Sequence, residues 1–242
     1  MDFSVIEFSN KDNYLIVMAC SDSSIRIWSF LYKTSEYILI LNKKYSTKCL
    51  LNVTYILEKD YCYLLVTSTD GFITLWDISN YIYSSEIIIK SSEESFLPIW
   101  KNQIHQSNIK SMILRRLEEN VYLLVTGGDD NKINILKIIV KLDSNLSNYK
   151  ISSKTITNKL NAHNSSITGL AFSVSGLLFS IATDQKLKIW KIDTSQLVYL
   201  AEFYTYIADP CGISIAKVLN KEILAIYGVG LEFFSFDYTF FI

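Results

Sequence analysis

The chain has 242 residues, half of them hydrophobic, so it can bury a sizeable core without disulfides or structural metals. Its 23 Lys and Arg nearly balance 24 Asp and Glu, giving a formal net charge of −1. This balance excludes a disordered chain and a surface that is basic throughout, as a general nucleic-acid binder would have. Only 8 Gly and 2 Pro are present, which excludes collagen-like and proline-rich sequences.

Cysteine usage and hydropathy indicate the cellular compartment of the protein. The four cysteines form no C-x-x-C pair, and only two histidines are present, so we predict no metal site and reduced cysteines packed as small hydrophobes. They are Cys20, Cys49, Cys62 and Cys211. The N-terminus lacks a secretory signal. The longest uncharged run, residues 160–183, contains polar residues and a turn and cannot cross a membrane as one apolar helix. We expect a soluble, cytoplasmic protein with no membrane contact.

An internal repeat then dominates the chain from its N-terminus onward. Four segments each combine a short apolar run, a polar turn and an alternating segment, and they end at Trp28, Trp76, Leu136 and Trp190. An aspartate precedes each end by six residues: Asp22, Asp70, Asp130 and Asp184. These aspartates are 48, 60 and 54 residues apart. A looser fifth copy ends near Phe234 without the aspartate and with a shorter turn.

Each copy has the pattern of a tight β-hairpin. The continuous apolar run is typical of a strand covered on both faces, and Leu64 to Val66 is an example. Asp, Asn, Ser and Gly favour the turn because they tolerate positive φ or bond their own backbone. The second half alternates with period two, as in Leu187 and Ile189 around Lys188, which indicates a strand with one inward face.

Further short strands are expected between the hairpins. They cover residues 109–114, 168–172, 198–203 and 213–218. We interpret the polar stretches 91–94 and 143–158 as surface loops. About four strands per 50 residues predict an all-β protein of about five blade-like antiparallel sheets, within one domain over residues 1–242.

The repeat resembles that of the WD-repeat β-propeller family over essentially the whole chain. His105 and His163 lie where that family places its Gly-His dipeptide. In the family, a His, a strand Ser or Thr, the turn Asp and the Trp form an internal hydrogen-bond network. The resemblance therefore implies a structural network of His163, Ser180, Asp184 and Trp190. The third copy keeps His105, Thr126 and Asp130 but has Leu136 for Trp, and the first two copies lack the His, with Asp22 and Asp70 as turn residues.

Two enzyme interpretations compete with this one. His163, Ser180 and Asp184 have the residue types of a hydrolase triad, but Ser180 lies within an apolar strand and no G-x-S-x-G elbow is present. The paired glycines at 127–128 and 228–230 lie in hairpins, with no helix following them as a methyl-donor site would require. We therefore predict no catalytic residue, no cofactor and no enzyme activity.

A narrower resemblance is to the C-terminal region of a family of long, multi-propeller WD-repeat subunits. It is carried by IHQSNIKS (104–111), TGGDDNKINI (126–135), AHNSSITGL (162–170), ATDQKLKIW (182–190), IADP (207–210) and GVGLEFFSF (228–236). It implies a non-catalytic scaffold that binds a tRNA ribose 2′-O-methyltransferase and helps to present the anticodon loop for wobble modification, with tRNA held through the complex. A generic WD-repeat adaptor that binds a peptide at the propeller face is the alternative.

Possible contact residues are numerous but not decisive. Basic residues that could follow an RNA backbone, or simply be solvated, are Lys43, Lys44, Arg115, Arg116, Lys186, Lys188 and Lys191. The aromatics are expected mostly to fill the core. The C-terminal aromatic residues alternate in part, as in a strand. Such a strand could pair with another blade or dock on a partner. These residues are Phe233, Phe234, Phe236, Tyr238, Phe240 and Phe241. Because that family's terminal propeller has more blades, we expect a truncated or terminal piece, with an incomplete or open ring as one alternative.

Overall fold

The structure is a computed structural model that describes residues 2–7, 13–83, 96–143, 148–194, 196–218 and 221–236. These residues form antiparallel sheets joined by tight turns, with one short helix, so the predicted all-β class is confirmed. The chain separates into two compact units, residues 1–109 and 110–242. That one domain spans residues 1–242 stays a prediction, as does the ring.

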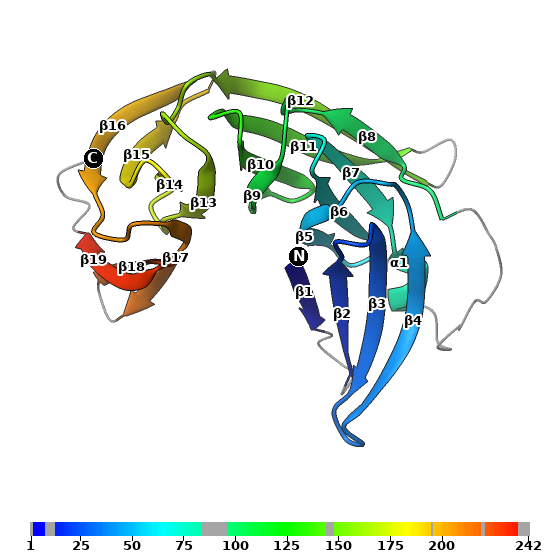
Figure 1. The fold of residues 1–242 in the computed structure, drawn as a ribbon. Coiled ribbons are helices and arrows are strands. Elements are labelled where there is room, and N and C mark those ends of the chain that lie inside the picture. The colour runs from blue at the N-terminus through cyan, green and yellow to red at the C-terminus, as the bar shows by residue number, and fades with distance from the viewer. Residues whose placement is uncertain are drawn as a thin grey trace. The chain divides into compact units, whose positions relative to one another are not determined.

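The first unit contains two four-stranded sheets, drawn in blue to green in Figure 1. The first sheet has the order β1 (Asp2–Glu7), β2 (Asn13–Ala19), β3 (Ser24–Leu31) and β4 (Glu36–Lys44). The second has the order β5 (Leu50–Leu57), β6 (Cys62–Ser68), β7 (Phe72–Asp77) and β8 (Trp100–Gln103), with helix α1 (Ser79–Tyr83) after β7. Each strand pairs with its neighbour in sequence, as successive hairpins do.

The second unit contains three sheets of the same type. The third sheet of the chain has the order β12 (Asn148–Lys159), β11 (Ile133–Asp143), β10 (Val121–Gly128) and β9 (Ile109–Glu118). The fourth has β13 (Ile167–Phe172), β14 (Leu178–Ala182), β15 (Lys186–Ile192) and β16 (Leu197–Tyr204). The fifth has three strands among the described residues: β17 (Pro210–Val218), β18 (Lys221–Gly228) and β19 (Gly230–Phe236). The predicted hairpins and the strands between them are confirmed.

The turns of the four complete repeats share one backbone conformation. The residue directly after the turn aspartate has positive φ in every copy: 70° at Ser23, 79° at Gly71, 61° at Asn131 and 59° at Gln185. Its N–H donates to the carbonyl three residues earlier, which closes a three-residue hairpin loop. Its carbonyl accepts an N–H from the segment after the outer strand, for example from Tyr45 to Ser23 at 3.0 Å and from Thr205 to Gln185 at 2.9 Å. The turn therefore fixes the outer strand as well as the hairpin.

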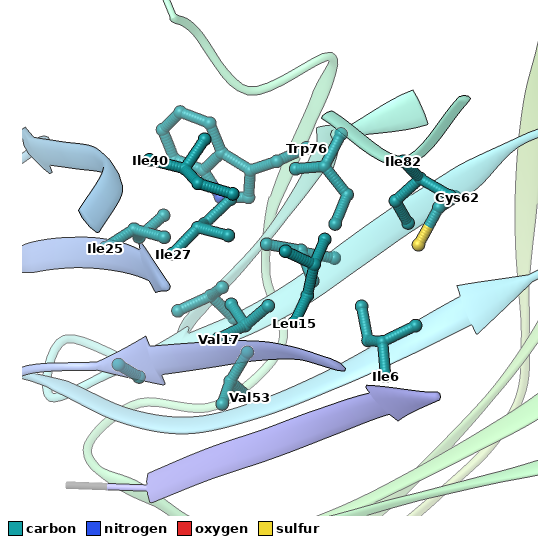
Figure 2. Close-up of a cluster of buried hydrophobic side chains, with 14 of the residues drawn as sticks. Ile6, Leu15, Val17, Ile25, Ile27, Ile40, Val53, Cys62, Trp76 and Ile82 are labelled. Carbon is teal, nitrogen blue, oxygen red and sulfur yellow. The ribbon is translucent and has the colours of Figure 1, made fainter. Parts of the chain in front are cut away.

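The core of each unit lies between sheets. In the first unit the inner face of the first sheet meets the second sheet, and Figure 2 shows Trp76 beside Ile27 and Ile40. In the second unit Trp190 packs in the same way in a cluster with Val125 and Ile135 of the third sheet. The strands that precede the turns, β6 and β14, are buried along their whole length, as their continuous apolar runs predict.

The expected surface loop over residues 143–158 is wrong for the part that the structure describes. Residues 148–159 form β12, which pairs with β11 from Ile133↔Lys159 to Asp143↔Asn148. The backbone supplies these bonds whatever the side chains are, so this outer strand can be mostly polar, with Ile156 among the few side chains that pack against the core. The other expected loop, residues 91–94, lies outside the described residues.

Candidate functional site

The fourth repeat brings four predicted residues into one chain of contacts. The indole N–H of Trp190 donates to Ser180 Oγ at 2.8 Å, and His163 Nε2 lies 2.7 Å from the same oxygen. His163 Nδ1 lies 3.2 Å from each carboxylate oxygen of Asp184. A neutral imidazole with its proton on Nδ1 satisfies all of these contacts, since it donates to Asp184 and accepts the Ser180 hydroxyl proton.

Burial and charge shape this network. His163 and Ser180 are 1% and 0% exposed, and burial lowers the pKa of His163 because it penalises the charged ring. Burial also works against ionisation of Asp184. The hydrogen bonds from His163 and from the backbone N–H groups of Asn164 and Lys186 outweigh it and hold the pKa of Asp184 at about 2. At neutral pH a neutral histidine is thus held by an ionised carboxylate.

This arrangement is structural rather than nucleophilic. The residue types and the order of contacts resemble a serine-hydrolase triad, but Ser180 Oγ has no exposed surface and already accepts the indole N–H of Trp190. A nucleophilic oxygen must reach a substrate carbonyl with an oxyanion hole beside it. The contacts instead satisfy one another and tie the turn, strand and loop of the repeat together.

The matching residues of the third repeat lie in both units. Thr126 and Leu136 are fully buried in the second unit, and His105 is buried in the first. The carboxylate of Asp130 accepts from the backbone N–H of Lys132 at 3.3 Å and forms an ion pair with its ammonium group at 3.0 Å. The Asp130 turn therefore has the same Asx geometry as the Asp184 turn, with a lysine as an additional partner.

The first two repeats lack the histidine, and their Trp or turn aspartate forms other hydrogen bonds. In the second, Trp76 donates its indole N–H to Thr74 Oγ1 at 2.9 Å, and Ser68 Oγ bonds Asp70 at 2.5 Å. In the first, Asp22 accepts from the backbone and hydroxyl of Ser24 and pairs with Arg26. The hydrogen bond from the Ser24 hydroxyl group is the largest cause that lowers the pKa of Asp22, and the backbone N–H of Ser24 and the charge of Arg26 lower it further. Sequence reasoning missed Thr74, although its place two residues before a Trp in a copy without His was the available signal.

Three of the seven candidate basic residues have partners within the chain that carry a structural role. Lys186 Nζ lies 2.7 Å from Glu202, and Lys188 Nζ donates to the Ala162 carbonyl at 2.8 Å. The Arg115 guanidinium lies over the ring of Phe172, 5.4 Å from its centroid. Lys44, Arg116 and Lys191 are exposed, while Lys43 is half-buried. Lys186 thus has a partner in its own sheet, and Lys188 has one in the loop before β13.

The structure also shows which cysteines are buried and whether side chains that could bind a metal lie together. Cys20 and Cys62 are buried as expected, and burial raises the pKa of Cys62, but Cys49 and Cys211 are exposed, so the prediction of four packed thiols is wrong for these two. They lie at the starts of strand segments, where the neighbouring sheet does not cover them. Within the described ranges no three His, Cys, Asp or Glu side chains gather as metal ligands would. No described helix has the length and apolar character to span a bilayer.

The C-terminal aromatic cluster divides between two faces of the last sheet. Phe234 and Phe236 pack against the fourth sheet, with Phe236 5.0 Å from Phe179 between ring centroids. Phe233 points to the other face and is 63% exposed. Tyr238, Phe240 and Phe241 lie outside the described residues. The expected alternation is thus present in the described part of the cluster.

The five antiparallel sheets, the common Asp turn and the buried Trp define a WD-repeat protein. The profile of the family "WD domain, G-beta repeat" matches residues 3–29 and 154–191, so the chain contains WD repeats. It is related at low identity to proteins named tRNA (34-2′-O)-methyltransferase regulator WDR6. Identity is 21% for the rat protein and 22% for the human one, over 91% of this chain and 21% and 22% of theirs. The bovine protein is 19% identical over similar shares. The chain therefore spans about a fifth of the length of these relatives.

Proposed function

We propose that this chain acts in the cytoplasm as a non-catalytic scaffold subunit that supports 2′-O-methylation of the tRNA wobble nucleotide through a partner methyltransferase. The observation that carries the proposal is the similarity to WDR6, which covers 91% of the chain. The relatives' name describes regulation of a methyltransferase that acts at tRNA position 34. In this proposal the tRNA is held through the complex and the catalytic groups belong to the partner.

The buried network supports the non-catalytic part of the proposal. The one triad-like set in the described residues is used to join β14, β15 and the loop before β13, and its serine oxygen is inaccessible to a substrate. A scaffold requires rigid sheets and exposed surface, which the repeat supplies. The generic adaptor remains the second candidate, because it requires the same fold and differs only in its partner.

The test is a deletion and rescue experiment. Deletion of the gene should lower 2′-O-methylation at tRNA position 34, and re-expression of the wild-type chain in its full-length context should restore it. The tagged protein should co-purify a tRNA methyltransferase. Unchanged methylation together with no methyltransferase in the purified complex would overturn the proposal and favour the generic adaptor.

A matched pair of variants separates scaffold from enzyme. Ser180→Ala removes the triad-like oxygen, and Thr74→Val removes the corresponding oxygen of the second repeat without touching the triad-like set. Rescue by both variants should follow the amount of folded protein. If Ser180→Ala alone abolished rescue at equal folded abundance, an enzymatic role would replace the scaffold.

A further inference from the structure

The loop between β16 and β17 (orange in Figure 1) begins in the same way as the loop before β13. In the fourth repeat, the N–H of Ala162 donates at 2.9 Å to the carbonyl that follows the turn aspartate of the third repeat, and His163 comes next. In the fifth repeat, the N–H of Thr205 donates at 2.9 Å to the carbonyl of Gln185, which follows the turn aspartate of the fourth repeat. Tyr206 comes next in the chain, at the place of His163.

The two loops also end in the same way. Ser166 is the third residue after the histidine of the fourth repeat, and its carbonyl accepts the N–H of Thr183 at 3.0 Å. Asp209 is the third residue after Tyr206, and its carbonyl accepts the N–H of Val229 at 3.4 Å. The spacing and two backbone hydrogen bonds therefore place Tyr206 at the histidine position of the fifth repeat.

The side chains at this position have opposite environments. His163 is buried and contacts the turn aspartate Asp184, whereas Tyr206 is 93% exposed. The turn of the fifth repeat, residues 228–230, contains no aspartate that could hold a side chain inward. Glu232 of β19 holds the loop backbone instead, because one oxygen of its carboxylate accepts the Thr205 hydroxyl at 2.5 Å and the Tyr206 N–H at 2.9 Å.

Both neighbours of Tyr206 are fixed. Thr205 and Ile207 are buried, and Ile207 packs in the core between the fourth and fifth sheets. The Ile207 carbonyl accepts the side-chain amide of Gln185 at 3.1 Å, and the Ile207 N–H donates to Thr205 Oγ1 at 3.1 Å. The loop thus presents an exposed aromatic ring from an ordered backbone. Such a ring loses little conformational entropy when it binds, which is why tyrosine is common among the residues that dominate binding energy.

The surroundings of the ring are apolar and acidic. Val229, which lies beside the loop at the tip of the β18–β19 hairpin, is 72% exposed. Asp209 and Glu232 form no ion pair with any side chain in the described part of the chain. Residues 203–216 and 222–236 contain no Lys or Arg, and Lys186 at the neighbouring turn is paired with a glutamate. This charge disfavours a phosphate backbone and favours a cation, which the face of a tyrosine ring also attracts.

We propose that Tyr206, Asp209 and Val229 form a binding site for an arginine side chain in an exposed segment of a partner protein. The guanidinium group stacks on the Tyr206 ring and pairs with the Asp209 carboxylate, and the methylene groups of the arginine lie against Val229. Arginine fits better than lysine because its planar group can stack and bond a carboxylate at the same time. The site is built within the second unit alone, and it does not rest on the proposed role in tRNA methylation.

Peptide binding to the 242-residue chain tests the proposal. The probe is a fluorescein-labelled nonapeptide of glycine and serine with three arginines, and its matched partner has lysines in their place. Fluorescence anisotropy should show tighter binding of the arginine peptide. Tyr206→Ala and Asp209→Asn should each weaken it about tenfold, while Tyr206→Phe, which keeps the ring, should bind like the wild type. Tyr32→Ala is the matched control, since Tyr32 is an exposed tyrosine of the first unit, and it should change nothing.

Thermal unfolding and an RNA probe complete the test. Tyr206→Ala should unfold at the wild-type temperature, because the ring makes few contacts within the chain. A clear loss of stability would mean that the chain itself covers the ring, and it would overturn the proposal. So would an arginine peptide that does not bind, or one whose binding is weakened equally by Tyr32→Ala. Tighter binding of a labelled single-stranded oligouridylate than of the arginine peptide would also overturn it and indicate a nucleic-acid surface.

Discussion

Trp76 donates its indole N–H to Thr74 Oγ1, two residues earlier in its own strand, at 2.9 Å. The corresponding Trp190 donates across to Ser180 on the neighbouring strand, at 2.8 Å. Val66 stands where Ser180 stands, and it pairs directly with Thr74 across the hairpin. The acceptor for the repeat Trp has therefore moved across a strand pair, and both solutions keep a buried indole N–H bonded.

The two acceptors should differ in their contribution to stability. Thr74→Val leaves one buried donor, the Trp76 N–H, without its acceptor, and should cost about 1–3 kcal/mol in the free energy of unfolding. Ser180→Ala removes the partner of both Trp190 and His163 and should cost roughly 2–5 kcal/mol. Urea unfolding of the two variants and the wild type measures both values. Equal costs would contradict the role of Ser180 as a double partner.

Truncation of the repeat Trp tests where the core lies. Trp190 is 2% exposed and packs between the third and fourth sheets. Trp190→Ala should lower the free energy of unfolding by about 3–5 kcal/mol, as loss of a large core aromatic does. Denaturant unfolding followed by circular dichroism gives the value. A near-neutral result would show that the core has been mislocated.

Acid should weaken the fourth repeat through Asp184. The ordinary pKa of this carboxyl is 3.8 and the folded protein holds it at about 2, so its ionised form is favoured by folding. A depressed folded pKa contributes stability above the unfolded value, which is lost as pH falls from about 4 to about 2. The contribution is about 2 kcal/mol.

Asp184→Asn isolates this effect. The variant should be less stable than the wild type at neutral pH, and the difference in free energy of unfolding should shrink as pH falls toward 2. Thermal or urea unfolding at pH 7, 4 and 2 provides the measurement, with Leu160→Asp as the control for added or lost surface charge. A difference that stays constant with pH would mean that ionisation of Asp184 does not stabilise the fold.

The turn residues with positive φ should respond oppositely to substitution. At Gly71 a Cβ would lie 2.1 Å from the carbonyl oxygen of His105, so Gly71→Ala should be strongly destabilising. Ser23 has φ of 70°, a conformation that costs an L-residue about 1–2 kcal/mol and glycine almost nothing. Ser23→Gly should therefore be neutral or stabilising by up to about 1 kcal/mol. Melting temperatures of the two variants report the contrast, and a stabilised Gly71→Ala would refute it.

The sequence predicted the hairpins because their signals are local. An apolar run, a turn with Asp and an alternating segment each constrain backbone geometry over a few residues, as in the segment from Leu178 to Trp190. The mostly polar strand β12 was missed because its pairing with β11 depends on backbone hydrogen bonds, which the pattern of its side chains does not indicate. Thr74 was missed because in the repeat pattern the acceptor stands at the position of Ser180, where the second repeat has Val66, and Thr74 lies beside Val66 on the paired strand.

By itself, the sequence determined the all-β class and the position of each turn aspartate, since spacing along the chain encodes both, and its resemblance to the WD-repeat family implied the set of His163, Ser180, Asp184 and Trp190. Only the tertiary structure decided which oxygen accepts each indole N–H and which sheet faces pack together within a unit. Those outcomes depend on strand register and on the packing of one sheet against the next, where residues far apart in sequence meet. Trp28 and Trp76 have the same place in the repeat, and only the presence of a neighbouring sheet makes one half-buried and the other fully buried.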